Sequence, residues 1–301
     1  MRILITGGTG LIGRHLCQAL SAAGHQLTVL SRRPAMVPSL CGPQVEALAT
    51  LDEYGPERHW DAIINLAGEP IVDARWSARR RQVLRASRVA LTAQLVERIR
   101  RAKSKPAVLL SGSAIGYYGD GGQACLDEGA PAGKDFGAQL CAEWEAAALA
   151  AAPLGLRVCF LRTGLVLAAS GGILKKMRLP FSLGLGARLG SGKQGMSWIH
   201  IDDYVAIVLR LLDDAGAQGA YNMVAPQPVS NAEFTQALAG ALHRPSFLAA
   251  PAWLLELALG EVSALLLGGQ RASADRVQAL PYTFQYPDLA AALRALFRAT
   301  P

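Results

Sequence analysis

The first thirteen residues, Met1-Arg-Ile-Leu-Ile-Thr-Gly7-Gly8-Thr9-Gly10-Leu11-Ile12-Gly13, decide the fold. Residues 2–6 form an apolar run that predicts a short buried strand, and residues 11–23 predict a helix. Three glycines therefore lie where the strand turns tightly into the helix. Glycine allows positive φ and a close approach to a ligand, and the N–H groups at a helix start bind anions. The stretch predicts a pyrophosphate site; the alternative is a glycine-rich turn without a ligand.

The glycine spacing, Gly-x-x-Gly-x-x-Gly, resembles that of the short-chain dehydrogenase/reductase superfamily, which binds a nicotinamide dinucleotide at this turn. The second predicted strand, residues 26–31, ends in Ser31-Arg32-Arg33-Pro34. NAD-selective Rossmann proteins carry an acidic residue here that accepts both ribose hydroxyls. An acid would repel a 2′-phosphate, whereas a hydroxyl and two guanidinium groups can pair with it. The sequence therefore predicts NADP(H) as the cofactor.

Alternating strands and helices continue along the chain. Strands are expected at residues 45–48, 61–68, 107–111 and 156–161, with a long helix at 77–103. This alternation favours an α/β fold: a Rossmann-type doubly wound parallel sheet with a small C-terminal α/β lobe. We expect residues 1–165 to form the NADP-binding domain, completed by a segment near 196–225. Residues 166–301 would then form mainly the substrate lobe.

Two further segments resemble cofactor-binding elements of the superfamily. Thr50-Leu51 follow the third strand, where superfamily members lay the backbone against the adenine. Asn65-Leu-Ala-Gly68 resembles the Asn-Asn-Ala-Gly element, whose small residues let the cofactor pass over the strand ends. We expect Glu69 and Arg75 to face this crevice, with Glu69 either accepting hydrogen bonds from the ligand or paired with Arg75. The cofactor-binding residues implied are Gly7, Thr9, Gly10, Leu11, Ile12, Gly13, Ser31, Arg32, Arg33, Thr50, Leu51, Leu66, Ala67, Gly68, Glu69 and Arg75.

Candidate catalytic residues follow the fifth predicted strand, in Ser111-Gly-Ser113-Ala-Ile-Gly-Tyr117-Tyr118-Gly119. In extended members of the superfamily, a Ser or Thr here bonds the substrate hydroxyl or carbonyl, and a Tyr-Gly follows a few residues later. The resemblance implies catalytic roles for Ser113, Tyr117 and Tyr118. The alternative is that both tyrosines simply wall the pocket.

The usual acid/base pair of the superfamily is missing. Its enzymes carry Tyr-x-x-x-Lys on the next helix, expected here at residues 134–151, where the lysine lowers the pKa of the phenol. Alignment on Glu143 puts Asp135 at the tyrosine and Gln139 at the lysine. Aspartate is a poor general acid for a ketone near neutral pH, and glutamine carries no charge. The sequence keeps the cofactor site but removes the usual proton donor, so Tyr117 or Tyr118 is the expected replacement.

The segment after the sixth strand is rich in glycine. Residues 171–195 predict a mobile loop that serves as a lid over the crevice. Residues 190–195 match Gly-x-Gly-x-x-Gly by letter, but no strand precedes them, so a second nucleotide site is not expected. Further on, Asp202 or Asp203 is expected to cap a helix. His200 either faces the substrate or is a structural hydrogen-bonding residue.

The charge and the cysteine content limit which binding partners and which cellular compartment are expected. The formal net charge is +7, and arginines and lysines gather between Arg75 and Lys105. Aromatic residues do not alternate with them, so a solvated helix face is favoured over a nucleic-acid surface. Five scattered cysteines without a Cys-x-x-Cys pair predict reduced thiols in a cytoplasmic protein, and the histidines lack metal-ligand spacing. No metal and no nucleic acid are expected.

One apolar run needs its own interpretation. Residues 251–267 are largely apolar, but Glu256 and Glu261 interrupt a stretch too short to span a bilayer comfortably. We expect a buried or oligomer-facing helix and no membrane partner. Self-association of the chain is therefore left open.

Seven motifs occur in order along the chain and extend the resemblance to its whole length. They are Gly-Gly-Thr-Gly-x-Ile-Gly, Ser-Arg-Arg-Pro, Asn-Leu-Ala-Gly-Glu, Gly-Tyr-Tyr-Gly, Trp-Glu-Ala-Ala-Ala, Trp-Ile-His-Ile-Asp-Asp and Gly-Glu…Leu-Leu-Leu-Gly-Gly-Gln. Together they resemble the atypical extended short-chain dehydrogenases called epimerase family proteins, which end in a domain of unknown function. The resemblance implies an NADP(H)-dependent oxidoreductase or epimerase acting on a small carbonyl or sugar-like substrate. The alternative is a non-catalytic NADP(H)-binding sensor.

Overall fold

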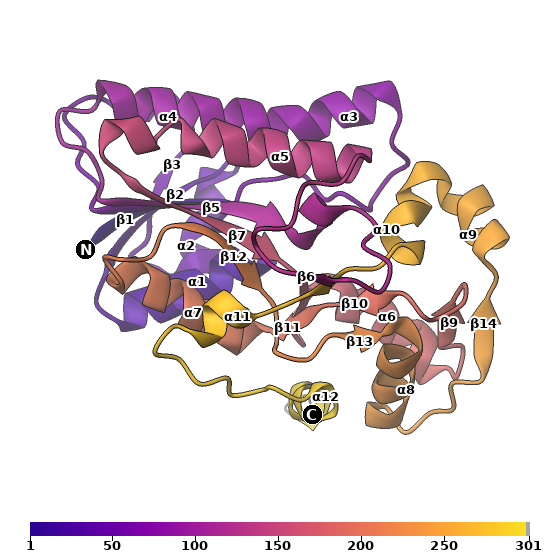
Figure 1. Ribbon diagram of the computed structural model, residues 1–301. Helices are drawn as coiled ribbons and strands as arrows, with labels where there is room; N and C mark the ends of the chain where they lie inside the picture. The colour runs from indigo at the N-terminus through magenta and orange to yellow at the C-terminus, as the bar shows by residue number, and fades with distance from the viewer. Residues whose placement is uncertain (299–301) are drawn as a thin grey trace.

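A parallel seven-stranded sheet forms the centre of the computed structural model, which describes residues 1–298 (Figure 1). Its strand order is β12-β7-β5-β4-β1-β2-β3. The strands are β1 (Arg2–Thr6), β2 (Gln26–Leu30), β3 (Glu46–Leu48), β4 (Ala62–Asn65), β5 (Val108–Ala114), β7 (Arg157–Thr163) and β12 (Gly219–Met223). The chain runs from β1 towards one edge and then returns to the other side of β1, so the predicted doubly wound sheet is confirmed. In such sheets ligands bind beyond the carboxyl ends, beside the point where the order reverses.

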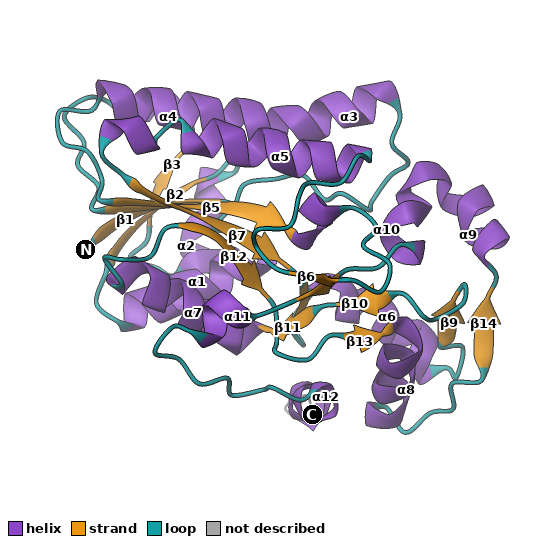
Figure 2. Cartoon of the chain, in the orientation of Figure 1, coloured by secondary structure: helices purple, strands orange, loops and turns teal. Residues whose placement is uncertain are grey.

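Helices cover both faces of the sheet (Figure 2). One face carries α1 (Leu11–Ala22), α2 (Val37–Cys41) and α7 (Ile201–Asp213). The other carries α3 (Ala78–Arg85), α4 (Leu91–Arg101) and α5 (Phe136–Leu149). A π-helical turn, Ala86–Ala90, joins α3 to α4, so the long helix predicted at 77–103 is present. The Ser77 hydroxyl caps it by accepting a hydrogen bond from the Arg80 N–H.

Alternating side chains of the strands fill two cores. Ile3 and Ile5 of β1 point towards α1 and α7, whereas Leu4 points towards α4 and α5. Each is completely buried, as is Ile63 of β4. Burial of such a side chain contributes roughly 1.5–3 kcal/mol, so the unbroken apolar runs account for a sheet covered on both faces.

A smaller lobe follows β7. Its helices are α6 (Gly172–Ser182), α8 (Asn231–Ala241), α9 (Ala252–Leu259), α10 (Ala264–Leu267), α11 (Asp275–Gln278) and α12 (Leu289–Arg298). Four strand pairs link it: β8 (Leu165–Leu167) with β11 (Trp198–His200), β9 (Ala187–Leu189) with β14 (Leu248–Ala250), β10 (Gly195–Met196) with β13 (Val229–Ser230), and β6 (Cys125–Leu126) with β15 (Arg271–Ala272). Phe181, Trp198 and Phe234 form its core together with apolar residues of α12.

Two expectations for this lobe are wrong. Residues 171–195 are not one loop, because α6 and β9 form within them. Leu174, Met177 and Phe181 lie three to four residues apart and give α6 an apolar face, which the glycine content obscured. The helix cap is also different: the Nδ1 atom of His200, rather than Asp202 or Asp203, accepts the N–H of residue 202.

The C-terminal segment returns to the sheet after the small lobe. Asp203, at the start of α7, accepts hydrogen bonds from the Tyr282 hydroxyl and from the N–H groups of Gln285 and Tyr286. The Gln270 side chain donates to the carbonyl of Gly119, 2.5 Å away. The lobe is thus tied to the loop that follows β5. The division into domains at residue 165 stays a prediction, and residues 299–301 of its second domain lie outside the described residues.

Candidate functional site

The glycine turn after β1 has the geometry expected of an anion-binding helix start. Gly7 has a φ of +72°, and a Cβ there would lie 2.7 Å from the carbonyl carbon of Leu66. A Cβ on Gly13 would lie 2.4 Å from the Gly7 oxygen, so the turn packs on itself too closely for any side chain. Gly10 precedes α1, and among residues 1–298 no side chain caps it. The first N–H groups of α1, at Leu11 and Ile12, are therefore the donors that fit a pyrophosphate.

Ser31, Arg32 and Arg33 stand at the carboxyl end of β2, next to this turn. The Arg32 Nη1 lies 2.7 Å from the Glu69 Oε1, and its side chain is 90% exposed. Since β1 separates β2 from β4, this ion pair crosses the end of β1. The Ser31 hydroxyl accepts the N–H of Arg33, which fixes the bend after the strand. A cluster of one hydroxyl and two exposed guanidinium groups fits a ribose 2′-phosphate.

Arg75 does not pair with Glu69, so that expectation is wrong. Its guanidinium donates to the carbonyl oxygens of Leu257 and Ala258 at the end of α9, at 2.5–3.0 Å. Arg75 therefore joins the loop after β4 to the small lobe. Any contact between Arg75 and a cofactor stays a prediction.

The ends of β3 and β4 are shaped by their neighbours. Thr50 and Leu51 line a hollow of about 590 Å³ against α4, and Thr50 precedes a short 3₁₀ helix, Leu51–Glu53. Behind Gly68, the Arg88 guanidinium donates to the carbonyl oxygen of Glu69 at 2.9 Å. A Cβ on Gly68 would lie 2.9 Å from the Arg88 Cζ, so a side chain here would displace the guanidinium from its hydrogen bond.

A buried hydrogen-bond network stabilises that same β4 end. The Thr6 hydroxyl donates to the Asn65 Oδ1 at 2.7 Å and accepts the N–H of Ala67. The Asn65 amide donates in turn to the Thr92 hydroxyl at 2.8 Å. The main chain of residues 65–67 is therefore held in place without a ligand.

The three candidate catalytic residues lie together at the ends of β5 and β7. Ser113 is paired in register with Arg162. The Ser113 hydroxyl donates to the Glu145 Oε1 at 2.6 Å, and that carboxylate also accepts Nε and Nη2 of Arg162 at 2.9 Å. Arg162 further donates to the Tyr118 hydroxyl at 3.0 Å. The Arg162 Cζ lies 3.6 Å from the ring centroid of Tyr117, a cation–π contact.

The electrostatics of this cluster constrain what each group can do. Burial raises the pKa of Tyr118, and the neighbouring Arg162 opposes the shift only in part. Burial disfavours the charge on Arg162, but its hydrogen bonds to Glu145 raise its pKa overall. Tyr118 donates its proton to the Asn222 Oδ1 at 2.7 Å, so both its donor and its acceptor capacity are used. Tyr117 is only half-buried and packs edge-on against Tyr118, 5.5 Å between centroids.

The two residues that replace the usual dyad are structural in this fold. The Asp135 carboxylate caps α5 by accepting the N–H of Ala138 at 2.9 Å. Gln139 donates its side-chain amide to the carbonyl of Lys134 at 3.0 Å. Both side chains thus bond within their own helix start.

Three members of the network were not anticipated from the sequence: Glu145, Arg162 and Asn222. Asn222 of β12 pairs in register with Arg162. A signal for Glu145 existed, since it falls on the apolar stripe of α5 that includes Cys141, Trp144 and Ala148. A carboxylate at such a position needs a buried partner. Arg162, a charged residue near the end of an apolar strand, was the candidate for that partner.

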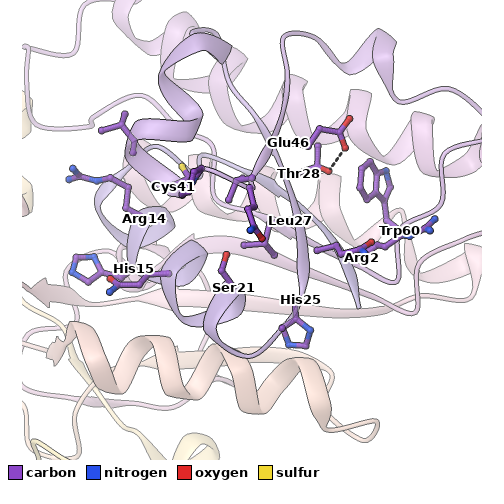
Figure 3. A pocket seen from close by; sticks show the side chains of 18 of the residues that line it. Arg2, Arg14, His15, Ser21, His25, Leu27, Thr28, Cys41, Glu46 and Trp60 are labelled. Atoms are coloured by element: carbon purple, nitrogen blue, oxygen red, sulfur yellow. Dashed lines mark hydrogen bonds between the residues drawn. The ribbon is translucent and has the colours of Figure 1, made fainter.

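Another hollow lies away from this edge of the sheet. A groove of about 1240 Å³ runs along α1 from the amino ends of β1 and β2 (Figure 3). Arg14 and His15 lie at one end of it and Arg2 and Trp60 at the other, where the Thr28–Glu46 hydrogen bond lies beside Trp60. Its cations are mixed with acids and it is not at the carboxyl edge. It therefore does not compete with the glycine turn as a cofactor site.

The basic stretch between Arg75 and Lys105 is largely neutralised by its surroundings. Its ion pairs are Arg80–Glu69, Arg81–Glu261, Arg85–Glu143, Arg98–Asp52, Arg100–Glu97, Arg101–Glu97 and Lys103–Glu57. Within residues 1–298, no cluster of three His, Cys, Asp or Glu side chains could hold a metal ion. None of the helices described there is long and apolar enough to cross a membrane.

Comparisons with known proteins agree on one family. A model of the NAD-dependent epimerase/dehydratase family matches residues 3–223, and a model of a domain of unknown function, DUF1731, matches residues 250–296. The crystal structure of human epimerase family protein SDR39U1 (isoform 2) with NADPH superposes with a TM-score of 0.90 at 36% identity. That match covers 99% of this chain and 100% of the human one.

Curated relatives extend over nearly the whole chain as well. The chloroplastic epimerase family protein SDR39U1 homolog of Arabidopsis thaliana is 37% identical, over 99% of this chain and 87% of the relative. An epimerase family protein of Mycobacterium bovis is 40% identical, over 97% of this chain and 96% of the relative.

Proposed function

Because the chain belongs to the NAD-dependent epimerase/dehydratase family, we propose that it binds NADP(H) beyond the carboxyl ends of β1, β2 and β4. The observation that carries this is the uncapped start of α1 with Arg32 beside it. The human relative was crystallised with NADPH, which supports the choice of cofactor. The first N–H groups of α1 would hold the pyrophosphate, Ser31 and the two arginines the 2′-phosphate, and Thr50-Leu51 the adenine side.

We further propose an oxidoreductase or epimerase acting on a small carbonyl or sugar-like substrate. The nicotinamide supplies or accepts a hydride when bound, and this chain's residues position the substrate and move a proton. Ser113 donates its own proton to Glu145, so its oxygen is suited to accept a hydrogen bond from a substrate hydroxyl. The Tyr118 hydroxyl already accepts a hydrogen bond from Arg162 and donates one to Asn222. Tyr117 is then the candidate proton donor.

The alternative function is a non-catalytic NADP(H)-binding sensor. The observation that favours it is the loss of the dyad, because Asp135 and Gln139 serve as helix-start hydrogen-bonding residues. The buried network of Ser113, Glu145 and Arg162 could then be purely structural. Both functions require the same cofactor site.

Two measurements test these proposals. Titration of intrinsic fluorescence with NADPH and NADH tests the cofactor; equal affinities would refute the assignment to NADP(H). Absorbance of NADPH in the presence of a panel of aldehydes, ketones and keto-sugars tests catalysis. Steady consumption supports the enzyme, and tight, redox-selective binding without turnover supports the sensor.

A further inference from the structure

The small lobe exposes an apolar surface that the proposed function does not use. Seven large apolar side chains on it are exposed by 45–79%, and we call them the apolar patch: Leu179, Leu183, Leu185, Phe247, Trp253, Leu254 and Leu257. The helix α9 supplies three of them, and not one of its residues is buried although its sequence is Ala-Trp-Leu-Leu-Glu-Leu-Ala-Leu. Of the two expectations for this helix, burial within the chain is therefore wrong, and an oligomer-facing helix stays a prediction. Large apolar side chains exposed in this number on one lobe mark an interaction site.

The fold brings these residues to one edge of the molecule. β9 and β14 pair with Ala187 opposite Leu248, so Leu185 and Phe247 precede neighbouring strands at the same end. The Arg244 Nε donates to the carbonyl of Ser182 at 2.7 Å, which ties the loop after α6 to the loop before β14. α9 follows β14 directly, and Figure 1 shows β9, β14 and α9 together at the right-hand edge.

Positive charge predominates in the segments that carry the apolar patch. Residues 146–201 and 234–255 contain no Asp or Glu. The exposed cations among them are Lys175, Lys176, Arg178, Arg188, Lys193 and Arg244, of which Lys176 pairs with Asp73. Glu256 of α9 is the acid nearest in sequence. Apolar side chains that include Trp and Phe, flanked by Lys and Arg, are the composition of surfaces that lie in the interface of an anionic membrane.

We propose that the apolar patch docks this protein on an anionic lipid bilayer, with Phe247, Trp253 and the leucines inserted among the headgroups. A second copy of the chain is the poorer occupant. A two-fold contact through the patch would bring the cations of these segments close to their own copies with few acids to offset them. An anionic bilayer provides an apolar interior for the side chains of the patch and negatively charged headgroups for the cations. The residues of the patch are not among those proposed to hold the cofactor.

Sedimentation with vesicles tests the proposal on the full chain. We expect the protein to sediment with vesicles of phosphatidylcholine mixed with phosphatidylglycerol, to ignore pure phosphatidylcholine, and to be released by added salt. Phe247→Asp and Leu183→Asp should each weaken partitioning at least ~10-fold. Lys175→Glu should weaken it more than about fivefold. Leu149→Asp, at an exposed leucine of α5 outside the patch, is the matched control and should change nothing.

Other outcomes overturn the proposal. Equal binding to neutral and anionic vesicles, or binding to neither, would exclude an anionic bilayer. Light scattering that shows a dimer, lost in Phe247→Asp, would make a second copy the occupant. NADPH affinity measured on the same variants should be unchanged, which shows that they are folded. It also separates failure of this inference from failure of the proposed cofactor.

Discussion

Arg32 and Glu69 form an ion pair across the end of β1, from the two strands that flank it, with 2.7 Å between Nη1 and Oε1. The pair therefore lies over the glycine turn. An incoming phosphate would compete with the Glu69 carboxylate for the guanidinium, because both are anions. The affinity for the phosphorylated dinucleotide should thus depend on both residues, and in opposite directions.

Arg32→Ala should weaken NADPH binding about 10-fold, or about 1.4 kcal/mol, and leave NADH binding unchanged. The reason is the loss of one charge-assisted pair with the 2′-phosphate. Fluorescence titration of both dinucleotides measures it. Arg79→Ala, an exposed arginine of α3, is the control for net charge. A variant that still prefers NADPH would remove Arg32 from the site.

Glu69→Gln should tighten NADPH binding by up to about fivefold, because it removes the competing anion and releases an exposed pair of at most ~1 kcal/mol. NADH, which lacks the 2′-phosphate, should respond less. The same titrations decide this. Weaker binding of both dinucleotides would instead mean that Glu69 accepts hydrogen bonds from the ligand.

Glu145→Gln should lower the free energy of unfolding by about 3 kcal/mol, because it leaves the Arg162 guanidinium buried without its carboxylate. Their side chains are 10% and 5% exposed. Urea denaturation measures the change. Arg85→Gln is the matched control: it breaks a bidentate pair with Glu143 whose side chains are 42% and 39% exposed, and should cost less than ~1 kcal/mol.

Once a substrate is found, Tyr117→Phe should abolish most turnover, whereas Tyr118→Phe should act mainly on stability. Tyr118 already donates to Asn222, and burial raises its pKa, so it is a poor proton donor. Ser113→Ala should raise KM more than it lowers kcat. Asp135→Asn keeps the helix cap and serves as the comparison. If only Asp135→Asn loses activity, with NADPH affinity unchanged, the aspartate is the proton donor.

His200→Gln should flatten the pH dependence of stability below about pH 6.5. Burial lowers the pKa of His200 from its ordinary 6.5, against the opposing charges of Asp202 and Asp203. The unfolded chain then binds the proton more tightly than the folded one, so stability falls as pH drops below 6.5. We expect roughly 1 kcal/mol between about pH 7 and about pH 5. Urea midpoints at both pH values test it; parallel slopes for both proteins would contradict it.

The order of strands and helices in the Rossmann part could be predicted from the sequence. Its strands are apolar runs, and glycines or capping residues mark its turns. The first strand, Arg2–Thr6, agrees to the residue. Ser230 and Glu233 form a capping box, a motif that neighbouring residues alone specify. The family resemblance, built on ordered motifs, is confirmed by the matches over residues 3–223 and 250–296.

The predictions that were wrong concern contacts between residues that are far apart in the sequence. Arg75 was expected near Glu69, but its partners are carbonyl groups of α9, 182–183 positions away. Nothing local distinguishes an arginine that pairs with a neighbour from one that bonds to a distant helix end. Likewise, α7 begins at Ile201, so Asp202 and Asp203 fall inside its first turn and His200 is the cap, while three donors of the C-terminal segment bind Asp203. The site residues of the cofactor remain predictions until a dinucleotide is titrated.

The return of the chain at Gly269 and Gln270 has a consequence for synthesis. These residues hydrogen-bond to Asp120 and Gly119, 149 and 151 positions earlier. On the ribosome, the tyrosine-bearing loop would leave the exit tunnel long before its tether exists. The strands and helices of the Rossmann part are made before these two residues. The loop gains its contacts with them only when the last tenth of the chain has been synthesised. A chain stalled or cleaved before residue 269 would keep the glycine turn but lack the groups that hold the loop in place.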